Sequence, residues 1–359
     1  MIQTKLALLG CGDVAQRDYL PEMQRLAGRY ELVAVCGRSP ERVERVARQY
    51  AVRAWYTDYT RMLAETDAEA VINLTPMQLH DETNLAIVMS GRHLYSEKPF
   101  ASAPEAGRRI AAIAQQRNLV VVAAPCVLLF PQLQLARSLL DEGALGRITS
   151  AHGIGFGGVP PWAGFASDPS QYFAAGGGPL RDMGVYPLHA LTGLLGPARR
   201  VSAMASQVQQ HFTIGDGPFV GKQIPIEEAD NWHLLLDFGD GRLATVEANN
   251  CAQATRAPQL ELFGLQATLA VDLLNVAAPL ALLRAGSDWA TIEVPHAGRA
   301  SGPDHLLGIE HLLDCVQQQI RPILSASHAL HVLDIIEQAG RSAADGRSYD
   351  LASTFYSRV

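Results

Sequence analysis

The chain has 359 residues, a length that favours about two domains rather than one. Hydrophobic residues make up 48 % and charged residues 18 % of it, a balance that is typical of compact folded proteins and argues against disorder. The formal net charge is −7 and no block of Lys and Arg runs along the sequence, which excludes the basic stripe of a nucleic-acid-binding protein.

No targeting or membrane segment is evident in the sequence. The first apolar run, Leu6–Leu9, ends at Gly10 and is too short for a signal-peptide core, and no apolar stretch reaches membrane-spanning length. The five cysteines are odd in number and scattered, and they form no Cys-x-x-Cys pair, as expected of reduced thiols. We therefore expect a cytoplasmic protein without membrane contact. The histidines form no convincing metal-ligand pattern, so we expect no metal ion.

The first 124 residues alternate short apolar runs with longer amphipathic ones, which predicts strands that alternate with helices. The predicted strands are Lys5–Gly10, Glu31–Cys36, Ala70–Leu74, His93–Ser96 and Leu119–Ala123. The predicted helices are Val14–Ala27, Pro40–Tyr50, Gln78–Ser90 and Pro104–Gln116. Residues 1–124 are therefore expected to form an α/β domain of the Rossmann type, with a doubly wound parallel sheet and right-handed crossovers.

Residues 125–359 have a different pattern. The helix Pro131–Glu142, the strand Arg147–Phe156 and a Gly/Pro-rich loop are followed by one short helix, about Pro179–Leu195. The strands that follow have no helices between them: Val201–Gln207, Trp232–Phe238, Leu243–Asn249, Gln259–Phe263, Thr268–Asp272 and Thr291–Val294. This order predicts an α+β domain with a largely antiparallel open sheet. Two helices, about Leu306–Gln319 and Ser327–Ala344, close the chain and are expected to pack back towards the first domain.

A dinucleotide-binding motif directly follows the first predicted strand. Gly10-Cys11-Gly12-Asp13-Val14-Ala15 fits the pattern Gly-x-Gly-x-x-Gly/Ala and opens a helix. Gly10 allows the tight turn, Gly12 allows the diphosphate to approach the backbone, and Ala15 allows the helix to pack closely on the strand. In this strand–helix context the motif predicts that Gly10, Gly12, Asp13, Val14 and Ala15 bind a dinucleotide. The alternative is a glycine-rich turn that binds no ligand.

The end of the second strand indicates which dinucleotide is preferred. An acidic residue usually stands there and binds the ribose 2′-hydroxyl of NAD, but this chain has Gly37 at that position. Arg38 and Ser39 follow, and a guanidinium with a hydroxyl suits a 2′-phosphate. We therefore expect NADP(H) to be preferred, with NAD(H) also possible. Arg38 could instead stack on the adenine or face water.

Two further stretches carry side chains suited to proton transfer. Lys98, in Glu97-Lys98-Pro99, follows a predicted strand at the edge where parallel sheets bind ligands, although a lone lysine is more often a surface charge. On the predicted helix after the glycines 176–178, Asp182 and Tyr186 are four residues apart, and His189 is seven residues after Asp182. This spacing places a carboxylate, a phenol and an imidazole on one helical face. The set could transfer protons, or it could belong to an internally hydrogen-bonded helix.

Together these motifs resemble those of the Gfo/Idh/MocA oxidoreductase family. The resemblance rests on the fingerprint Gly10–Ala15, on Thr75-Pro76 with His80, on Glu97-Lys98-Pro99 and on residues 176–189, in the family's order and spacing. The closing helix, His328–Leu333 and beyond, is also similar, so that the resemblance spans essentially the whole chain. It implies that Thr75, Pro76, His80 and Glu97 join the cofactor site.

The resemblance also implies an activity and a role for the polar residues. Family members transfer hydride between a nicotinamide and a carbon that bears oxygen on a sugar, cyclitol or polyol, and a homodimer or homotetramer is expected. Lys98 would lie near the nicotinamide and the reacting bond, and Asp182 would orient the substrate. Tyr186 would be the acid/base, which near neutral pH requires a positive charge such as Lys98 beside the phenol.

Several alternatives remain open at this point. His189 departs from the pattern of many relatives, and it could transfer the proton, bind a substrate hydroxyl or be a packed core residue. Trp162 could approach the cofactor or the substrate, or anchor its loop. Other functions of the same fold are an NAD-dependent glycoside hydrolase, a non-catalytic cofactor- or sugar-sensing protein, and an oxidoreductase acting on a non-sugar ring.

Overall fold

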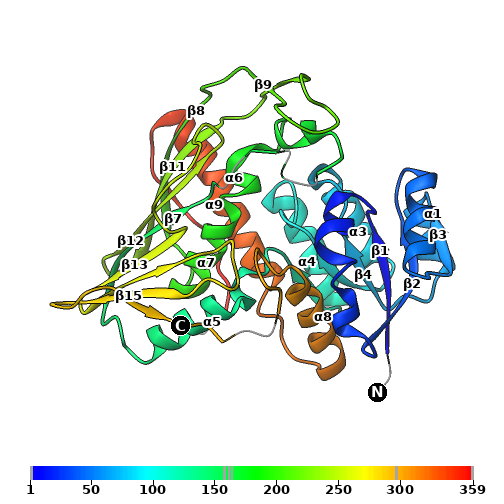
Figure 1. Ribbon diagram of the computed structural model, residues 1–359, viewed down its shortest axis with the longest axis horizontal. Helices are drawn as coiled ribbons and strands as arrows, with labels where there is room; N and C mark the ends of the chain where they lie inside the picture. Colours follow the sequence, from blue (N-terminus) through cyan, green and yellow to red (C-terminus); the bar gives the residue numbers. More distant parts are fainter. Residues whose placement is uncertain (1–2, 157–158, 161, 163–164, 296–297, 357–359) are drawn as a thin grey trace. The chain divides into compact units, whose positions relative to one another are not determined.

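The structure is a computed structural model, which describes residues 3–156, 159–160, 162, 165–295 and 298–356 (Figure 1). Two larger sheets and one small two-stranded sheet are found within these residues. None of the helices in this part of the chain combines the length and the apolar composition needed to span a membrane. Across the same residues, no group of three or more His, Cys, Asp or Glu side chains is arranged to hold a metal ion.

The first sheet is parallel and has the strand order β3-β2-β1-β4-β5-β6, the order of a Rossmann fold. Its strands are β1 Thr4–Leu9, β2 Tyr30–Cys36, β3 Ala54–Tyr56, β4 Ala70–Asn73, β5 His93–Ser96 and β6 Val121–Ala123. The main helices of this part are α1 Pro40–Gln49, α2 Tyr59–Glu65, α3 His80–Met89, α4 Pro104–Gln116 and α8 Leu306–Gln318. The central strand β1 is buried on both faces, which explains its apolar run Leu6–Leu9. The expected doubly wound parallel sheet is confirmed.

One predicted helix of this domain is wrong. Instead of a continuous helix over Val14–Ala27, a π-helix covers Ala15–Tyr19 and a 3₁₀-helix covers Met23–Leu26. Pro21 explains the interruption, because it has no N–H to donate and its ring collides with the carbonyl four residues earlier in a helix. The structure also contains β3 and α2, which were not predicted. β3 has only three residues, too few for a recognisable alternation.

The second sheet is mixed and mostly antiparallel, with the strand order β16-β15-β14-β13-β7-β12-β11-β8-β17. Its strands are β7 Ile148–Ile154, β8 Arg200–Ser206, β11 Asn231–Gly239, β12 Arg242–Asn249, β13 Leu260–Gly264, β14 Ala267–Val271, β15 Leu280–Arg284, β16 Ala290–Ile292 and β17 Tyr349–Asp350. Among the described residues of this sheet, only β7 and β12 pair in parallel. The small sheet pairs β9 His211–Thr213 with β10 Gln223–Pro225. The predicted largely antiparallel sheet is thus confirmed.

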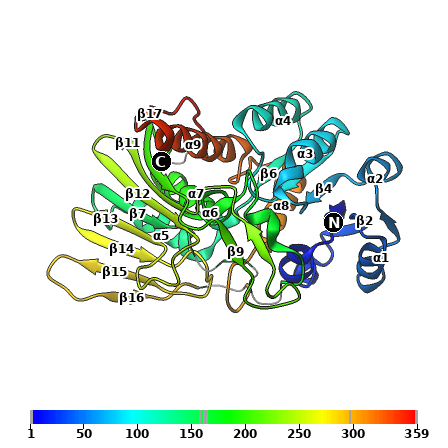
Figure 2. The ribbon, with the colours of Figure 1, turned by 90° about the horizontal axis from the view of Figure 1, so that it is seen from above.

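Helices cover one face of this second sheet (Figure 2). α5 Pro131–Asp141 packs against β14, and α7 Val185–Leu195 packs against β7, β12 and β13. Residues therefore alternate between buried and more exposed positions along β11 and β12. Three large apolar side chains of these strands and of β8 are exposed on the other face: Met204 (81 %), Leu235 (45 %) and Leu243 (43 %). The closing helix α9 is Ala326–Asp345.

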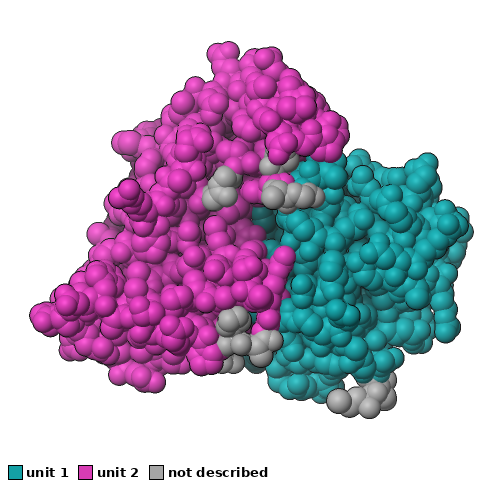
Figure 3. Space-filling view, in the orientation of Figure 1, with its two compact units in different colours: residues 1–125, 164–167, 305–330 teal, residues 126–163, 168–304, 331–359 magenta. Residues whose placement is uncertain are grey.

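The chain divides into two compact units (Figure 3). The first unit comprises Met1–Pro125, Gly164–Ser167 and His305–Leu330, and the second unit comprises Cys126–Ala163, Asp168–Asp304 and His331–Val359. The division expected from sequence, 1–124 and 125–359, assigns the two shorter segments of the first unit to the second domain. One of them contains α8, which packs against β5 and β6 of the parallel sheet.

Candidate active site

The dinucleotide fingerprint of the first unit has the geometry that its glycines allow. Gly10 has φ +104°, and a Cβ there would lie 2.5 Å from the main-chain carbonyl group of Leu74. Gly12 is different, because a Cβ built on it would meet no atom within 4 Å. The fold therefore requires glycine at position 10, whereas at position 12 the missing side chain leaves open space above the loop. Such space is what the close approach of a diphosphate to the backbone needs, so the loop fits a dinucleotide.

The end of β2 lies directly beside this loop. The Gly10 N–H donates to the Cys36 carbonyl at 2.8 Å, and a Cβ on Gly37 would lie 3.0 Å from the Val43 side chain and 3.4 Å from the Cys11 nitrogen. An acidic side chain at position 37 would therefore be crowded. Arg38 is exposed, and Ser39 is the N-cap of α1, where its hydroxyl oxygen accepts the N–H of Arg42.

Polar side chains connect the ends of β4 and β5. Asn73 is fully buried, and its Oδ1 accepts the N–H and the hydroxyl of Thr75. His80 is also fully buried, with Nδ1 2.5 Å from the Pro99 carbonyl oxygen and Nε2 3.0 Å from that of Thr75. Burial lowers the pKa of His80, and the two carbonyl oxygens oppose that shift. His80 thus ties the Thr75-Pro76 turn to the segment that carries Lys98.

Glu97 fixes the backbone from which Lys98 extends. Its carboxylate is 9 % exposed and accepts the Tyr19 hydroxyl and, at 2.8 Å, the Lys98 N–H. The Tyr19 hydroxyl also lies 2.8 Å from that of Tyr95. The Glu97 carboxylate therefore accepts hydrogen bonds from two donors of the protein itself. Lys98 is half-buried and belongs to the first unit.

The glycine-rich turn at 176–178 belongs to the second unit. Gly176 and Gly178 have φ values of +77° and +78°, and a Cβ on Gly177 would lie 2.8 Å from a main-chain oxygen. All three positions are thus unfavourable for other residues. Two glutamates hold the turn, because Glu227 accepts the N–H of Ala175 and Glu228 accepts the N–H of Gly176.

The helix predicted over Pro179–Leu195 is interrupted. α6 ends at Asp182 (Gly178–Asp182) and α7 begins at Val185, so Asp182 and Tyr186 lie on separate helices and the predicted continuous helix is wrong. The break falls at Met183-Gly184, where a neighbouring segment passes close by: a Cβ on Gly155, just after β7, would lie 2.5 Å from the Gly184 Cα. The two backbones thus approach too closely for larger residues.

Asp182, Tyr186 and His189 are nevertheless all buried, with exposed fractions of 4 %, 8 % and 5 %. Burial, together with the charge of His331, lowers the pKa of His189 to about 3. The imidazole is therefore neutral near pH 7 and can exchange hydrogen bonds without carrying charge. Trp162, in the preceding loop, is half-buried and packs edge-to-face on Tyr172 at a centroid distance of 5.2 Å.

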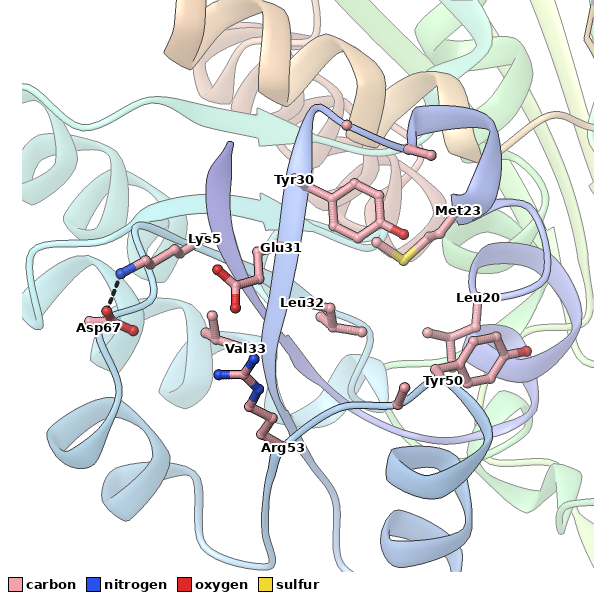
Figure 4. A pocket seen from close by; sticks show the side chains of 13 residues that line it. Lys5, Leu20, Met23, Tyr30, Glu31, Leu32, Val33, Tyr50, Arg53 and Asp67 are labelled. Atoms are coloured by element: carbon pink, nitrogen blue, oxygen red, sulfur yellow. Dashed lines mark hydrogen bonds and ion pairs between the residues drawn. The ribbon is translucent and has the colours of Figure 1, made fainter. Parts of the chain in front are cut away.

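A cavity of about 770 Å³ in the first unit is lined by none of these residues (Figure 4). It is lined by residues at the starts of β1 and β2, among them Lys5, Tyr30 and Glu31, and by Arg53 and Asp67. Parallel sheets bind ligands at the carboxyl ends of their strands, whereas this cavity is at the amino ends. It contains no residue that the sequence predicts for the site.

The structure thus brings the predicted residues together in two groups. The first unit holds the fingerprint, Arg38, Ser39, the Thr75–His80 turn and the Glu97-Lys98 segment, and the second unit holds Trp162, Asp182, Tyr186 and His189. Sequence reasoning missed the residues that support these groups, such as Tyr19 beside Glu97 and Gly155 beside Gly184. Their partners are distant in the sequence, and no local pattern indicates them.

Comparison with known proteins identifies both parts of the chain. Residues 4–124 match the model of an oxidoreductase family with an NAD-binding Rossmann fold, and residues 133–270 match that of the GFO/IDH/MocA C-terminal domain. The two matches together cover well over half of the chain. They include the fingerprint, Lys98, Asp182 and Tyr186.

Individual relatives act on sugars. A dTDP-3,4-didehydro-2,6-dideoxy-alpha-D-glucose 3-reductase of Saccharopolyspora spinosa is 30 % identical over 57 % of this chain and 60 % of its own. A D-glucoside 3-dehydrogenase of Escherichia coli is 29 % identical over 68 % of this chain and 67 % of its own. The matches span only 56–60 % of the length of the first four curated relatives. A levoglucosan dehydrogenase solved with NADH and levoglucosan shares the fold, with a TM-score of 0.83 at 20 % identity over 98 % of this chain and all of that one.

Proposed function

Since the chain belongs to the Gfo/Idh/MocA family of oxidoreductases with an NAD-binding Rossmann fold, we propose that it is an NAD(P)-dependent dehydrogenase or reductase. Its substrate is a sugar, cyclitol or related polyol, and the reacting carbon bears a hydroxyl or a carbonyl group. The observation that carries this proposal is the burial of Asp182, at the end of α6, and of Tyr186 and His189 on α7, a helix whose other residues are mostly apolar. Buried polar groups are costly, so a set of them that suits proton transfer favours a catalytic role.

The bound nicotinamide supplies or takes up the hydride at C4. Lys98 polarises the oxygen on the reacting carbon, and Tyr186 accepts the hydroxyl proton during oxidation and returns it during reduction. A phenol has an ordinary pKa of about 10, so this role requires a positive charge beside the Tyr186 hydroxyl, and Lys98 is the residue that we propose for it. Asp182 orients the substrate. His189, neutral because burial lowers its pKa to about 3, is better suited to hydrogen-bonding a substrate hydroxyl than to serving as the base.

NADP(H) is the preferred cofactor in this proposal, and NAD(H) is accepted. Position 37 lacks the acidic side chain that would bind a ribose 2′-hydroxyl, and a larger residue there would crowd Val43 and Cys11. Arg38 is exposed next to this position and suits a 2′-phosphate. The Ser39 hydroxyl caps α1, so Arg38 carries most of the preference.

We further propose that the protein is a homodimer or homotetramer of the cytoplasm. The exposed Met204, Leu235 and Leu243 on the open sheet of the second unit support self-association through this face. All five cysteines are free thiols and four of them are buried, as is usual in a reducing compartment. Light scattering of the wild-type protein and of Leu235→Glu tests the association, since the variant is expected to be monomeric.

The experiment that tests the function is a fluorescence titration of the purified protein with NADPH and NADH, followed by turnover assays. The panel contains sugars, polyols and keto-sugars, each with the tighter-binding cofactor. Tight NADPH binding and net cofactor turnover on one of these substrates are expected. Tight binding without any turnover would overturn the dehydrogenase assignment in favour of a sensor or a cofactor-recycling glycoside hydrolase.

A further inference from the structure

A short segment after β7 docks on the dinucleotide-binding loop. Phe165–Ser167, called the strap here, groups with the first unit although residues 126–163 and 168–304 belong to the second. The Ser167 N–H donates to Asp13 Oδ2 at 2.7 Å, and Arg42 Nη1 donates to the Ser167 hydroxyl at 3.4 Å. Phe165 is 6 % exposed. The strap is thus fixed both to the fingerprint and to the first turn of α1.

Asp13 is an unexpected residue for a loop that receives a diphosphate. A carboxylate repels the phosphate charges unless its own charge is engaged or balanced. The Ser167 N–H engages Asp13, and charge-assisted hydrogen bonds of this kind are among the stronger ones in proteins. The Arg42 guanidinium is close enough to the loop to lower the pKa of the Cys11 thiol, although burial raises it to about 12 overall. Through its bond to Ser167, Arg42 also brings a positive charge to the contact between Asp13 and the strap.

We propose that the strap is part of the cofactor site and retains the bound dinucleotide, with Asp13 as the latch that holds the strap closed. The inference rests on the proposed function, because it concerns the cofactor of that reaction. Dissociation of the dinucleotide then requires the bond between Ser167 and Asp13 to break first. Ser167 and Asp13 are positioning residues in this mechanism, and neither takes part in hydride or proton transfer.

Two variants of Asp13 separate the hydrogen bond from the charge. Asp13→Asn and Asp13→Ala both remove the carboxylate charge, but only asparagine keeps a side-chain oxygen that can accept the Ser167 N–H. Each protein is loaded with NADPH, mixed with excess NADP⁺ in a stopped-flow instrument, and followed by the loss of bound-NADPH fluorescence. We expect Asp13→Ala to release NADPH about tenfold faster than Asp13→Asn, as for the loss of one hydrogen bond to the strap. Asp67→Asn, which removes an exposed carboxylate at the amino edge of the sheet, is expected to match the wild type.

A second measurement needs no cofactor and no activity. Hydrogen–deuterium exchange of the cofactor-free protein reports on the Ser167 amide directly. This amide is expected to be protected in the wild type and in Asp13→Asn, and to lose protection in Asp13→Ala. Ser167→Ala keeps the amide and removes only the hydroxyl that Arg42 contacts, so protection is expected to persist in it.

The outcomes distinguish the strap from the proposed function. Equal NADPH release rates for the two Asp13 variants, or an unprotected Ser167 amide in the wild type, would overturn the proposed role of the strap. Either result would leave the oxidoreductase assignment intact. Failure of every protein to bind NADPH and NADH would overturn both. Normal binding with the predicted difference in release, but without turnover on any sugar, would support the strap and overturn only the assigned reaction.

Discussion

Two buried histidines of the second unit predict that acid destabilises the protein. His331 is fully buried, its Nε2 accepts the Ala198 N–H at 3.0 Å, and its Nδ1 lies 2.9 Å from the Ser353 hydroxyl. Burial lowers its pKa to about 4, although the Ser353 carbonyl and Asp334 oppose the shift. Burial lowers the pKa of His189 further, to about 3. The charge of His331 adds to that shift, because His331 is already protonated at the pH where His189 would titrate.

The magnitude follows from proton linkage. Both groups have pKa values below the ordinary value of 6.5, so the unfolded chain binds protons that the folded protein does not. Stability is therefore unaffected above about pH 6.5 and falls as the pH decreases from there towards about 4 for His331 and about 3 for His189. Between pH 7.5 and pH 5.0 each histidine lowers the free energy of unfolding by about 2 kcal/mol, at about 1.4 kcal/mol per pKa unit. The pair accounts for about 4 kcal/mol, a large part of a typical domain stability of about 5–15 kcal/mol.

Urea unfolding at pH 7.5 and pH 5.0 measures this loss. Tryptophan fluorescence suits the measurement, because Trp162, Trp232 and Trp289 all lie in the second unit. Glutamine at position 331 can still hydrogen-bond but does not titrate. The loss of unfolding free energy between pH 7.5 and pH 5.0 should therefore be about 2 kcal/mol smaller in His331→Gln, which removes about half of the contribution of the pair. His211→Gln replaces an exposed histidine and should show the same loss of unfolding free energy between the two pH values as the wild type. An unaltered pH difference in His331→Gln would refute the reasoning.

Four other substitutions test the proposed site and the loop that supports it. Tyr186→Phe should lower kcat by about 10²- to 10⁴-fold, the usual contribution of an acid/base, without changing the Kd for NADPH. If this variant retains most of the activity in steady-state assays, proton transfer is instead assigned to His189. Arg38→Ala should weaken NADPH binding about tenfold in fluorescence titrations and leave NADH binding nearly unchanged, and equal losses would refute its role at the 2′-phosphate. Gly12→Val should abolish dinucleotide binding, because its side chain fills the space that the diphosphate needs. Its melting temperature should be unchanged, because a Cβ at position 12 meets no protein atom within 4 Å. Gly10→Ala should lower the free energy of unfolding by at least about 1–3 kcal/mol, because the φ of +104° at this position is strained for alanine. Equal stabilities of Gly12→Val and Gly10→Ala would contradict the different roles of the two glycines.

Much of the fold could be predicted because its elements have strong local patterns. β5 and α4 have the bounds expected from sequence, and most other predicted strands differ by one or two residues. The failures are local as well. Pro21 interrupts the first helix through a steric effect on the backbone, and the helix after the glycine-rich turn breaks at Met183-Gly184, where Gly155 approaches closely. Short strands such as β3 and β17 depend on pairing with distant partners, which no window of sequence contains.

The candidate site shows a different limit. Its chemical residues stand in recognisable motifs, but the residues that orient them do not. Glu97 is bound by Tyr19, which is 78 residues away in the sequence, and Ser167 is 154 residues from Asp13. A motif therefore predicts which groups are available, whereas their orientation depends on contacts formed only in the folded chain.

This difference bears on how the proposed chemistry is achieved. Hydride and proton transfer require reacting atoms to be held at about 3–3.5 Å, so small errors in orientation are costly. For the proposed role of Lys98, this orientation comes from a backbone that the Glu97 carboxylate holds and that His80 ties to the turn after β4. For the proposed role of Tyr186, the corresponding support is the close approach of Gly155 and Gly184 just before its helix. Each group is thus fixed within its own unit, and substitutions of these supporting residues should impair the reaction as strongly as changes to groups that touch the substrate.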